Sequence, residues 1–281
     1  MEANRPFRWD LIRPDNLGSL LDDVQSWEPF FLDDLVRCAA RVLGQSGDGV
    51  LYFVGRSVDS LFDLLSGALA DTEWSSRLRP LPLSLFQRDG RAFTDDELRQ
   101  LRTNLAADGL APAELMRGRP SVFVDLVHEG STFENLYGVL RRWVADEHAQ
   151  WDVIRRQLRF VGITARTKTS PNTWRWQQHA GFAAELPASA IRNVSLDARL
   201  WSYFGDYQYK TAASFRRTRW ADPEVADPRR DEKTRMALAE AVTLVAAART
   251  PKVRRQLAEL LTREPAIGER WLRDLQLSLR R

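Results

Sequence analysis

Cysteine is nearly absent from this sequence of 281 residues. The single cysteine, Cys38, excludes a disulfide framework and any zinc or iron–sulfur site built from cysteines. Long apolar runs are also missing: none approaches the roughly 18 residues of a transmembrane helix, and residues 1–14 lack the apolar core of a signal peptide. We therefore expect a soluble protein of the reducing cytoplasm that has no membrane partner.

Lysine is rare as well: only four of the 41 basic residues are lysines, and the other 37 are arginines. The arginine fork matches a phosphate group, but a bias toward GC-rich codons explains such a ratio equally well. The net charge is only +3, and the arginines of residues 228–281 are scattered among acids, which is typical of a solvated surface. We therefore do not expect a nucleic-acid partner.

Apolar runs of strand length alternate with helical stripes through the first 164 residues. The pair Thr94 and Glu97 has the spacing of a capping box and predicts a helix over residues 95–107. The predicted strands are residues 50–54, 81–86, 122–127 and 158–164, and further helical stripes lie at 61–69 and 133–148. This order predicts a doubly wound α/β fold with a mainly parallel sheet.

Three parts of the chain differ in character. Residues 1–164 are predicted to form the α/β core together with an N-terminal helical segment. Residues 165–227 are an aromatic-rich segment with a short strand expected at 191–194. Residues 228–281 return to helical periodicity and predict a C-terminal helical region.

The most informative segment runs from Asp125 to Thr132, where a buried strand ends in an acid and a short loop opens a helix. A helix N-terminus carries unpaired N–H groups and a partial positive charge, so it accommodates a phosphate. Gly130 lets the backbone approach such an anion closely. A second interpretation needs no ligand, because Ser131 and Glu134 have the spacing of a capping box. The residues alone leave both interpretations open.

This segment resembles the binding motif for 5-phosphoribosyl 1-diphosphate (PRPP) in the type I phosphoribosyltransferases. That motif is an apolar strand, two adjacent acids and a loop ending in Thr-Gly-x-Thr before a helix. The resemblance extends over roughly residues 28–165 and implies the sheet type of that family. It implies that Asp125, as the second acid, contacts a ribose hydroxyl and an accompanying Mg²⁺ ion. The implied loop around the 5-phosphate consists of His128, Glu129, Gly130, Ser131 and Thr132.

Two further turns fall where the family has functional loops. Arg56 and Ser57 follow the first strand, at the place of the pyrophosphate-binding loop. Arg88 and Arg91 fall in the mobile catalytic loop, so the resemblance implies catalytic roles for both, beside Asp125. The residues themselves also fit simpler roles, because Ser57 is suited to cap the next helix and the two arginines are suited to an ordinary exposed loop.

The sequence departs from the family pattern at three positions. Val124 stands at the first acidic position, so one ribose contact is missing. His128 replaces the residue that, in purine-salvage members, is an acid proposed to act on the base, and it offers a catalytic group that exchanges protons near neutral pH. Glu129 brings a carboxylate into the phosphate loop, where it repels an anion unless it points away or pairs with an arginine.

Aromatic residues gather in the segment 165–227. In the family a variable hood outside the core sheet binds the acceptor, and this segment is the candidate of suitable size. Its aromatic side chains are suited either to stack on a nucleobase-like acceptor or to pack in a core. The candidate acceptor-binding residues are Trp174, Trp176, Trp201 and Tyr203.

Three functions stay open on the sequence. The first is a divergent phosphoribosyltransferase-like enzyme that binds PRPP or a nucleotide, with Mg²⁺, and transfers or hydrolyses at the ribose C1 carbon. The second is a non-catalytic sensor of PRPP or a nucleotide that acts through the C-terminal helices. The third is a nucleic-acid-binding protein. The acceptor and the oligomeric state cannot be read from the residues, so a homodimer stays an open alternative.

Overall fold

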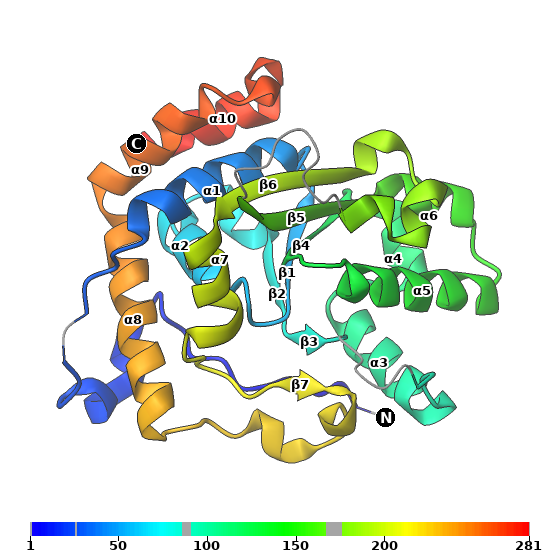
Figure 1. The fold of residues 1–281 in the computed structure, drawn as a ribbon, viewed down its shortest axis with the longest axis horizontal. Coiled ribbons are helices and arrows are strands. Elements are labelled where there is room, and N and C mark those ends of the chain that lie inside the picture. Colours follow the sequence, from blue (N-terminus) through cyan, green and yellow to red (C-terminus); the bar gives the residue numbers. More distant parts are fainter. Residues whose placement is uncertain (1, 26, 86–90, 167–175, 281) are drawn as a thin grey trace.

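A five-stranded parallel sheet runs through the middle of the computed structural model, which describes residues 2–25, 27–85, 91–166 and 176–280 (Figure 1). All neighbouring strands of this sheet pair in parallel. Their order across the sheet is β2 (Leu78–Leu81), β1 (Val50–Val54), β4 (Ser121–Leu126), β5 (Leu158–Arg166) and β6 (Ile191–Asp197). The predicted α/β class with a mainly parallel sheet is confirmed.

Helices cover both faces of the sheet, so its central strands are apolar on both sides. In β1, Leu51 and Phe53 belong to the core on one face, whereas Tyr52 and Val54 belong to the core on the other. This explains why β1 reads in the sequence as a continuous apolar run, with no alternation of polar and apolar residues. The predicted and observed limits of this strand are the same, residues 50–54.

One face carries two layers of helices (Figure 1). The inner layer is α1 (Leu32–Gln45) and α2 (Asp59–Leu69), which share a core with the sheet. The predicted C-terminal helices are present and form the outer layer, with α8 against α2, α9 against α1 and α10 against α9. Their limits are α8 (Glu232–Arg249), α9 (Pro251–Leu261) and α10 (Arg270–Ser278).

The opposite face is covered by four helices, α3 (Asp95–Ala107), α4 (Pro112–Arg117), α5 (Ser131–Asp146) and α6 (Trp151–Gln157). The predicted capping box of α3 is present, because Thr94 and Glu97 bond each other's backbone N–H groups at 3.2 and 2.9 Å. The short helices α4 and α6 were not predicted, since six or seven residues are too few to display a helical stripe.

The strand predicted over residues 81–86 is wrong in its extent. Leu81 ends β2, and a separate strand, β3 (Leu83–Ser84), leaves the main sheet to pair with β7 (Phe215–Arg216). Pro82 lies between the two strands, and its missing N–H interrupts the ladder there. Phe86 lies outside the described residues.

The segment 165–227 adds an edge strand to the main sheet, because β6 pairs with β5 from Phe160 to Arg166. The boundary predicted after residue 164 therefore falls inside the sheet. Apart from β6, the described residues 176–227 contain β7 and short helical turns, including α7 (Ala198–Ser202) and a π-helical turn over Tyr203–Tyr207. Among residues 2–25, 27–85, 91–166 and 176–280, no helix combines the length and apolar character that a bilayer crossing requires.

The N-terminal residues run along distant parts of the chain. The Asn4 side-chain amide donates to the Trp220 carbonyl at 3.3 Å and to the Asp222 carbonyl at 2.7 Å. The Phe7 N–H donates to the Val225 carbonyl at 2.9 Å. This segment therefore belongs to the folded core structure and is held by residues more than 200 positions away.

Candidate functional site

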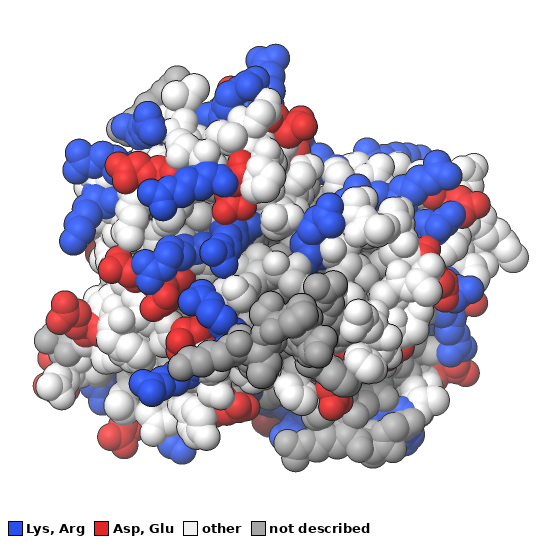
Figure 2. Space-filling view, turned by 45° about the horizontal axis from the view of Figure 1, so that its top comes forward, with Lys and Arg blue, Asp and Glu red and all other residues white. Residues whose placement is uncertain are grey.

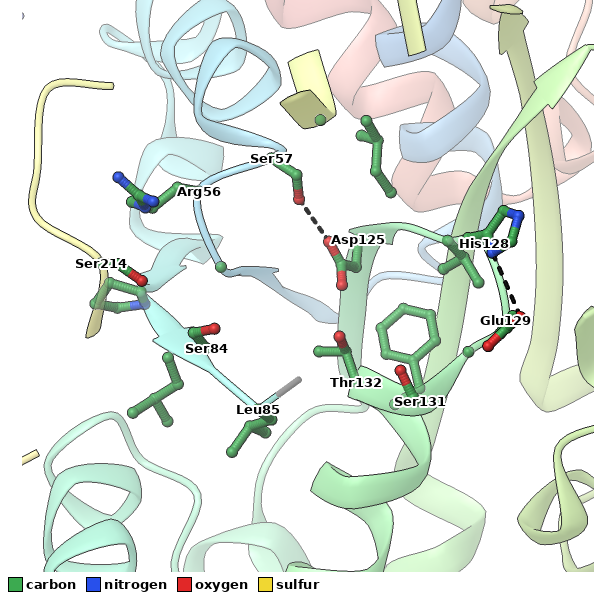
Figure 3. A pocket seen from close by; sticks show the side chains of 18 of the residues that line it. Arg56, Ser57, Ser84, Leu85, Asp125, His128, Glu129, Ser131, Thr132 and Ser214 are labelled. Atoms are coloured by element: carbon green, nitrogen blue, oxygen red, sulfur yellow. Dashed lines mark hydrogen bonds and ion pairs between the residues drawn. The ribbon is translucent and has the colours of Figure 1, made fainter. Parts of the chain in front are cut away.

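A cavity of about 340 Å³ opens at the carboxyl ends of β1 and β4 (Figure 3). The chain leaves β1 for β2 on one side and later returns to β4 on the other side of β1. Open α/β sheets bind their ligands at such a reversal of strand order, outside the carboxyl ends of the strands. The cavity is lined by the turn after β1, by β3, by the β4–α5 loop and by part of the segment 201–214.

Nine of the predicted site residues line this one cavity. They are Arg56, Ser57, Asp125, His128, Glu129, Gly130, Ser131, Thr132 and Trp201. Because β1 and β4 are parallel neighbours, the two predicted loops that follow them meet at the same edge of the sheet. Arg88 and Trp174, which were also predicted, lie outside the described residues.

Asp125 is the buried acid of the cavity, with only 6% of its surface exposed. Burial raises the pKa of its carboxyl from 3.8 to about 7, because the charged form loses its water. Hydrogen bonds from the Ser57 hydroxyl at 2.7 Å, from the Leu126 N–H and from the Thr132 side chain favour the charged form and limit this rise in pKa. Near pH 7 the carboxyl therefore passes readily between a form that accepts protons and one that donates them.

Helix α5 begins at the cavity without a side-chain cap. Gly130 is the residue before the helix and adopts φ +86°, a left-handed conformation that favours glycine. Ser131 is already the first helical residue, so the alternative capping box of Ser131 and Glu134 is not formed. The first N–H groups of α5 are thus left for a ligand or water in a loop that lines the cavity.

The buried side chain of Trp176 packs against the β4–α5 loop at Gly130. Its side chain is fully buried, and its Nε1 donates to Oδ1 of Asn193 on β6 at 2.7 Å. A Cβ atom added at Gly130 would lie 2.4 Å from Trp176 Cε3, and one added at Gly162 would lie 2.7 Å from Trp176 Nε1. The indole therefore occupies the space that these two glycines leave, and it presents no face to an acceptor.

His128 and Glu129 stand at the outer rim of the cavity and are directed away from Asp125 (Figure 3). Their side chains are 77% and 69% exposed, and His128 Nδ1 lies 3.8 Å from Glu129 Oε1. The Glu129 carboxylate thus points away from the place where a phosphate would bind. This is one of the two arrangements in which Glu129 does not repel a bound anion.

Arg56 turns toward the segment 208–214 and donates from Nη1 to the Ala212 carbonyl at 3.0 Å. Burial lowers the pKa of its guanidinium, and the positive charges of Arg229 and Arg216 lower it further, against the effect of Asp59. Arg56 thus brings a positive charge to this side of the cavity, which favours an anion.

Arg91 does not line the cavity. It forms an ion pair with Glu97 at the start of α3, with Nη2 2.5 Å from Oε1. The catalytic role that the resemblance implies for Arg91 stays a prediction.

Trp201 and Tyr203 face different parts of the molecule. Trp201 lines the cavity, with Nε1 bonded to the Ile163 carbonyl at 2.9 Å. The Tyr203 hydroxyl donates to Oε2 of Glu240 on α8 at 2.6 Å, and its ring packs against Phe30 and Phe31. Among the described residues predicted to bind the acceptor, Trp201 is therefore the one placed to contact a ligand.

Further residues reach the cavity through tertiary packing and were not among the predicted site residues. They are Pro82, Leu83, Ser84 and Leu85 around β3, and Gly205, Lys210 and Ser214 from the later segment. No local motif marks these residues. Lys210 is distinguished in the sequence as one of only four lysines.

Metal-binding side chains do not cluster in the part of the chain that the structure describes, where no group of three or more His, Cys, Asp or Glu could hold an ion. Among the described residues that line the cavity, Asp125 provides the buried carboxylate. Mg²⁺ commonly binds through one or two carboxylates together with substrate phosphates, so the residues fit this ion when a phosphorylated ligand supplies the other oxygens. No family model, curated protein or solved structure matches the chain.

Proposed function

We propose that the cavity binds a phosphorylated ribose, either PRPP or a nucleotide, and that the protein is a divergent phosphoribosyltransferase-like enzyme. One observation carries this proposal: the uncapped N-terminus of α5 and the buried Asp125 line the same cavity at the reversal of strand order. A phosphate group suits the helix N-terminus, and a ribose hydroxyl suits a carboxyl that accepts or donates a hydrogen bond.

In the proposed reaction the bond between ribose C1 and the departing diphosphate breaks, and a nucleophilic acceptor or water forms a new bond to C1. Positive charge develops on the ribose ring as the diphosphate leaves, and the ionised form of Asp125 stabilises it. The positive charge of Arg56 stabilises the departing diphosphate. Bound through Asp125 and the phosphates, Mg²⁺ would neutralise further charge on the leaving group.

A sensor without catalysis is the second candidate, and Val124 favours it. The side chain of Val124 is fully buried in the core shared with α1 and α2, whereas Asp125 faces the cavity. The ribose is therefore held by one acid where the phosphoribosyltransferases use two. The C-terminal helices that would pass on a signal pack against α1 and α2.

The nucleic-acid hypothesis gains no support from the surface. On the face shown in Figure 2, basic and acidic side chains are interspersed, whereas nucleic-acid binding favours a continuous basic stripe. Tyr207 and Tyr209 are exposed, at 74% and 45%, but exposed aromatic side chains alone do not define a binding surface for bases.

Titration calorimetry with PRPP, with and without Mg²⁺, tests the binding step. Thr132→Val removes one polar contact of the loop and should weaken PRPP binding by about 1–3 kcal/mol. Thr103→Val is the matched control, because Thr103 lies on α3, away from the cavity, and its hydroxyl donates to the Arg99 carbonyl in its own helix. Wild-type protein that binds neither PRPP nor a nucleotide would refute the proposal.

Release of pyrophosphate separates the enzyme from the sensor. The enzyme should release it from PRPP, slowly with water and faster with its acceptor, so a panel of nucleobases serves as the screen. Tight binding of PRPP with no pyrophosphate released across the panel would favour the sensor.

A further inference from the structure

Lys210 lines the cavity although it is far in the sequence from both predicted loops. Its Nζ donates to the Phe204 carbonyl at 2.8 Å and to Oε1 of Gln208 at 2.7 Å. Both acceptors are neutral, and within the described parts of the chain no carboxylate forms an ion pair with this ammonium. A positive charge that lines a cavity and lacks direct neutralisation is a candidate contact for an anion.

A buried polar network holds this lysine from behind. Gln208 donates from Nε2 to the Ser60 hydroxyl at 2.7 Å and to the carboxylate of Glu240 on α8. Glu240 also accepts the hydrogen bond of Tyr203. The chain of contacts therefore fixes the position of Lys210 from α2 and α8, as a binding site requires of its charged groups.

Two of the three acids whose charge acts on Lys210 have a cationic partner of their own. Asp59 and Asp63 on α2 both pair with Arg8, whose guanidinium nitrogens lie 2.8 and 2.5 Å from their Oδ1 atoms. Arg8 brings one positive charge to these two carboxylates, so it neutralises only part of their charge, and both still act on the ammonium of Lys210. Neither acid is in direct contact with Lys210, so the hydrogen-bonding positions of its ammonium are not taken up by a carboxylate.

The surroundings make an unneutralised ammonium costly. Burial lowers the pKa of Lys210 from 10.5 to about 8, and the charge of Arg56 lowers it further. The carboxylates of Asp59, Glu240 and Asp63 act in the opposite direction and raise this pKa. An anion placed in the cavity would stabilise the charged lysine and would be bound more tightly in return.

We propose that Lys210 binds a second anionic group of the ligand, beside Arg56 and apart from the phosphate at the α5 N-terminus. This inference rests on the proposed function, and it specifies the ligand as a sugar phosphate that carries a second phosphoryl group. Ribose 5-phosphate, with one phosphate, would contact α5 alone. PRPP would contact both α5 and Lys210.

Pyridoxal 5′-phosphate is a suitable probe, since it carries a phosphate for the cavity and an aldehyde for an amine. The neutral amine attacks the aldehyde carbon, water leaves, and added borohydride reduces the resulting imine to a stable secondary amine. The four lysines of the full chain, Lys168, Lys210, Lys233 and Lys252, make the modified position easy to identify by peptide mass spectrometry.

We expect modification at Lys210 at least fivefold faster than at Lys233 or Lys252, and we expect inorganic pyrophosphate to suppress it at Lys210 alone. A rate at Lys210 no higher than at the other lysines, or one that pyrophosphate leaves unchanged, would overturn the assignment. This measurement uses the wild-type protein and depends neither on turnover nor on the stability of a variant.

Variants then test the role in recognition. Lys210→Met should weaken PRPP binding about tenfold or more and ribose 5-phosphate binding less than threefold, whereas Lys210→Arg should retain most PRPP binding. Lys252→Met, at an exposed position of α9, is the matched control and should change neither. Equal losses for both ligands would overturn the assignment of Lys210. If wild-type protein binds neither ligand, the proposed function fails, and the pyrophosphate-protection measurement still decides the role of Lys210.

Discussion

The Ser57 hydroxyl donates a 2.7 Å hydrogen bond to Oδ1 of Asp125 and so joins the turn after β1 to the end of β4. The two residues are 68 positions apart in the chain and meet across the reversal of strand order. The bond holds the acid of the cavity in place from the neighbouring strand. It also sets the balance between the charged and neutral forms of Asp125, since it favours the charged form.

Asp125→Asn should stabilise the protein at alkaline pH. The folded-state pKa of about 7 exceeds the ordinary 3.8, so the folded protein binds an extra proton between these values. The stability contributed by Asp125 is therefore complete below about pH 4 and is lost as pH rises through 7. At about 1.4 kcal/mol per pKa unit, the variant should gain up to about 4 kcal/mol at pH 8 and little at pH 4.

Urea unfolding at both pH values measures this difference. Asp22→Asn at an exposed position is the control and should show no such trend. A gain that is equal at pH 4 and pH 8 would contradict the titration of Asp125.

Ser57→Ala should raise the pKa of Asp125 further, because the variant removes a hydrogen bond to the charged form. The ionised carboxyl would lose a partner at a cost of about 1–3 kcal/mol. The loss of stability relative to wild type should therefore be larger at pH 8, where the carboxyl is ionised, than at pH 5. Carbon-detected NMR titration of the Asp125 carboxyl measures the shift directly. Ser84→Ala removes another hydroxyl of the cavity and should leave that titration unchanged.

Gly130→Ala and Gly138→Ala should have opposite effects on the same helix. At Gly130 the new methyl group meets Trp176 at 2.4 Å and the backbone has φ +86°, so we expect a loss of about 3 kcal/mol and weaker PRPP binding. At Gly138, inside α5, nothing lies within 4 Å of the new methyl group, and the higher helix propensity of alanine should add up to about 1 kcal/mol. Thermal unfolding compares the two, and equal effects would show that Trp176 does not constrain the loop.

Arg8→Met should destabilise the protein by about 3–5 kcal/mol at pH 8, since it leaves Asp59 and Asp63 without their shared partner. Burial already raises the pKa of Asp63 to about 6, so below that pH its carboxyl is largely neutral and the loss should shrink. Arg13→Met removes an arginine that is 81% exposed and should cost less than about 1 kcal/mol at either pH. A loss independent of pH would contradict the role of Arg8 as the partner of these acids.

Local signals in the sequence were sufficient for part of the fold. The helix over residues 95–107 has its predicted limits. Its start is determined by Thr94 and Glu97, which contact each other's backbone three residues apart. The strand at residues 50–54 is bounded by Gly49 and Gly55, which interrupt the apolar run on both sides. The parallel arrangement then places Ser57 near Asp125, which explains why the two predicted loops meet.

Contacts between distant segments could not be read from the sequence in the same way. The position of Lys210 depends on the packing of residues 201–214 against α2 and α8, and no spacing in the sequence records it. Trp176 was identified as an aromatic residue of interest, but stacking on a ligand and burial under a loop require the same residue type. The glycine at position 130 was the available clue, because its missing side chain is what admits the indole.

The contacts between the N-terminal residues and residues 220–225 constrain the order of folding during translation. Asn4 and Trp220 are separated by 216 positions, so the carbonyls of Trp220, Asp222 and Val225 leave the ribosome long after residues 4–7, and after Asn104, which accepts from the Asn4 N–H. Helix α2 and its two acids can receive Arg8 early, whereas the backbone that holds Asn4 and Phe7 is not yet made. Vectorial synthesis therefore makes the contacts with residues 220–225 a late step, which follows the synthesis of all five strands of the parallel sheet.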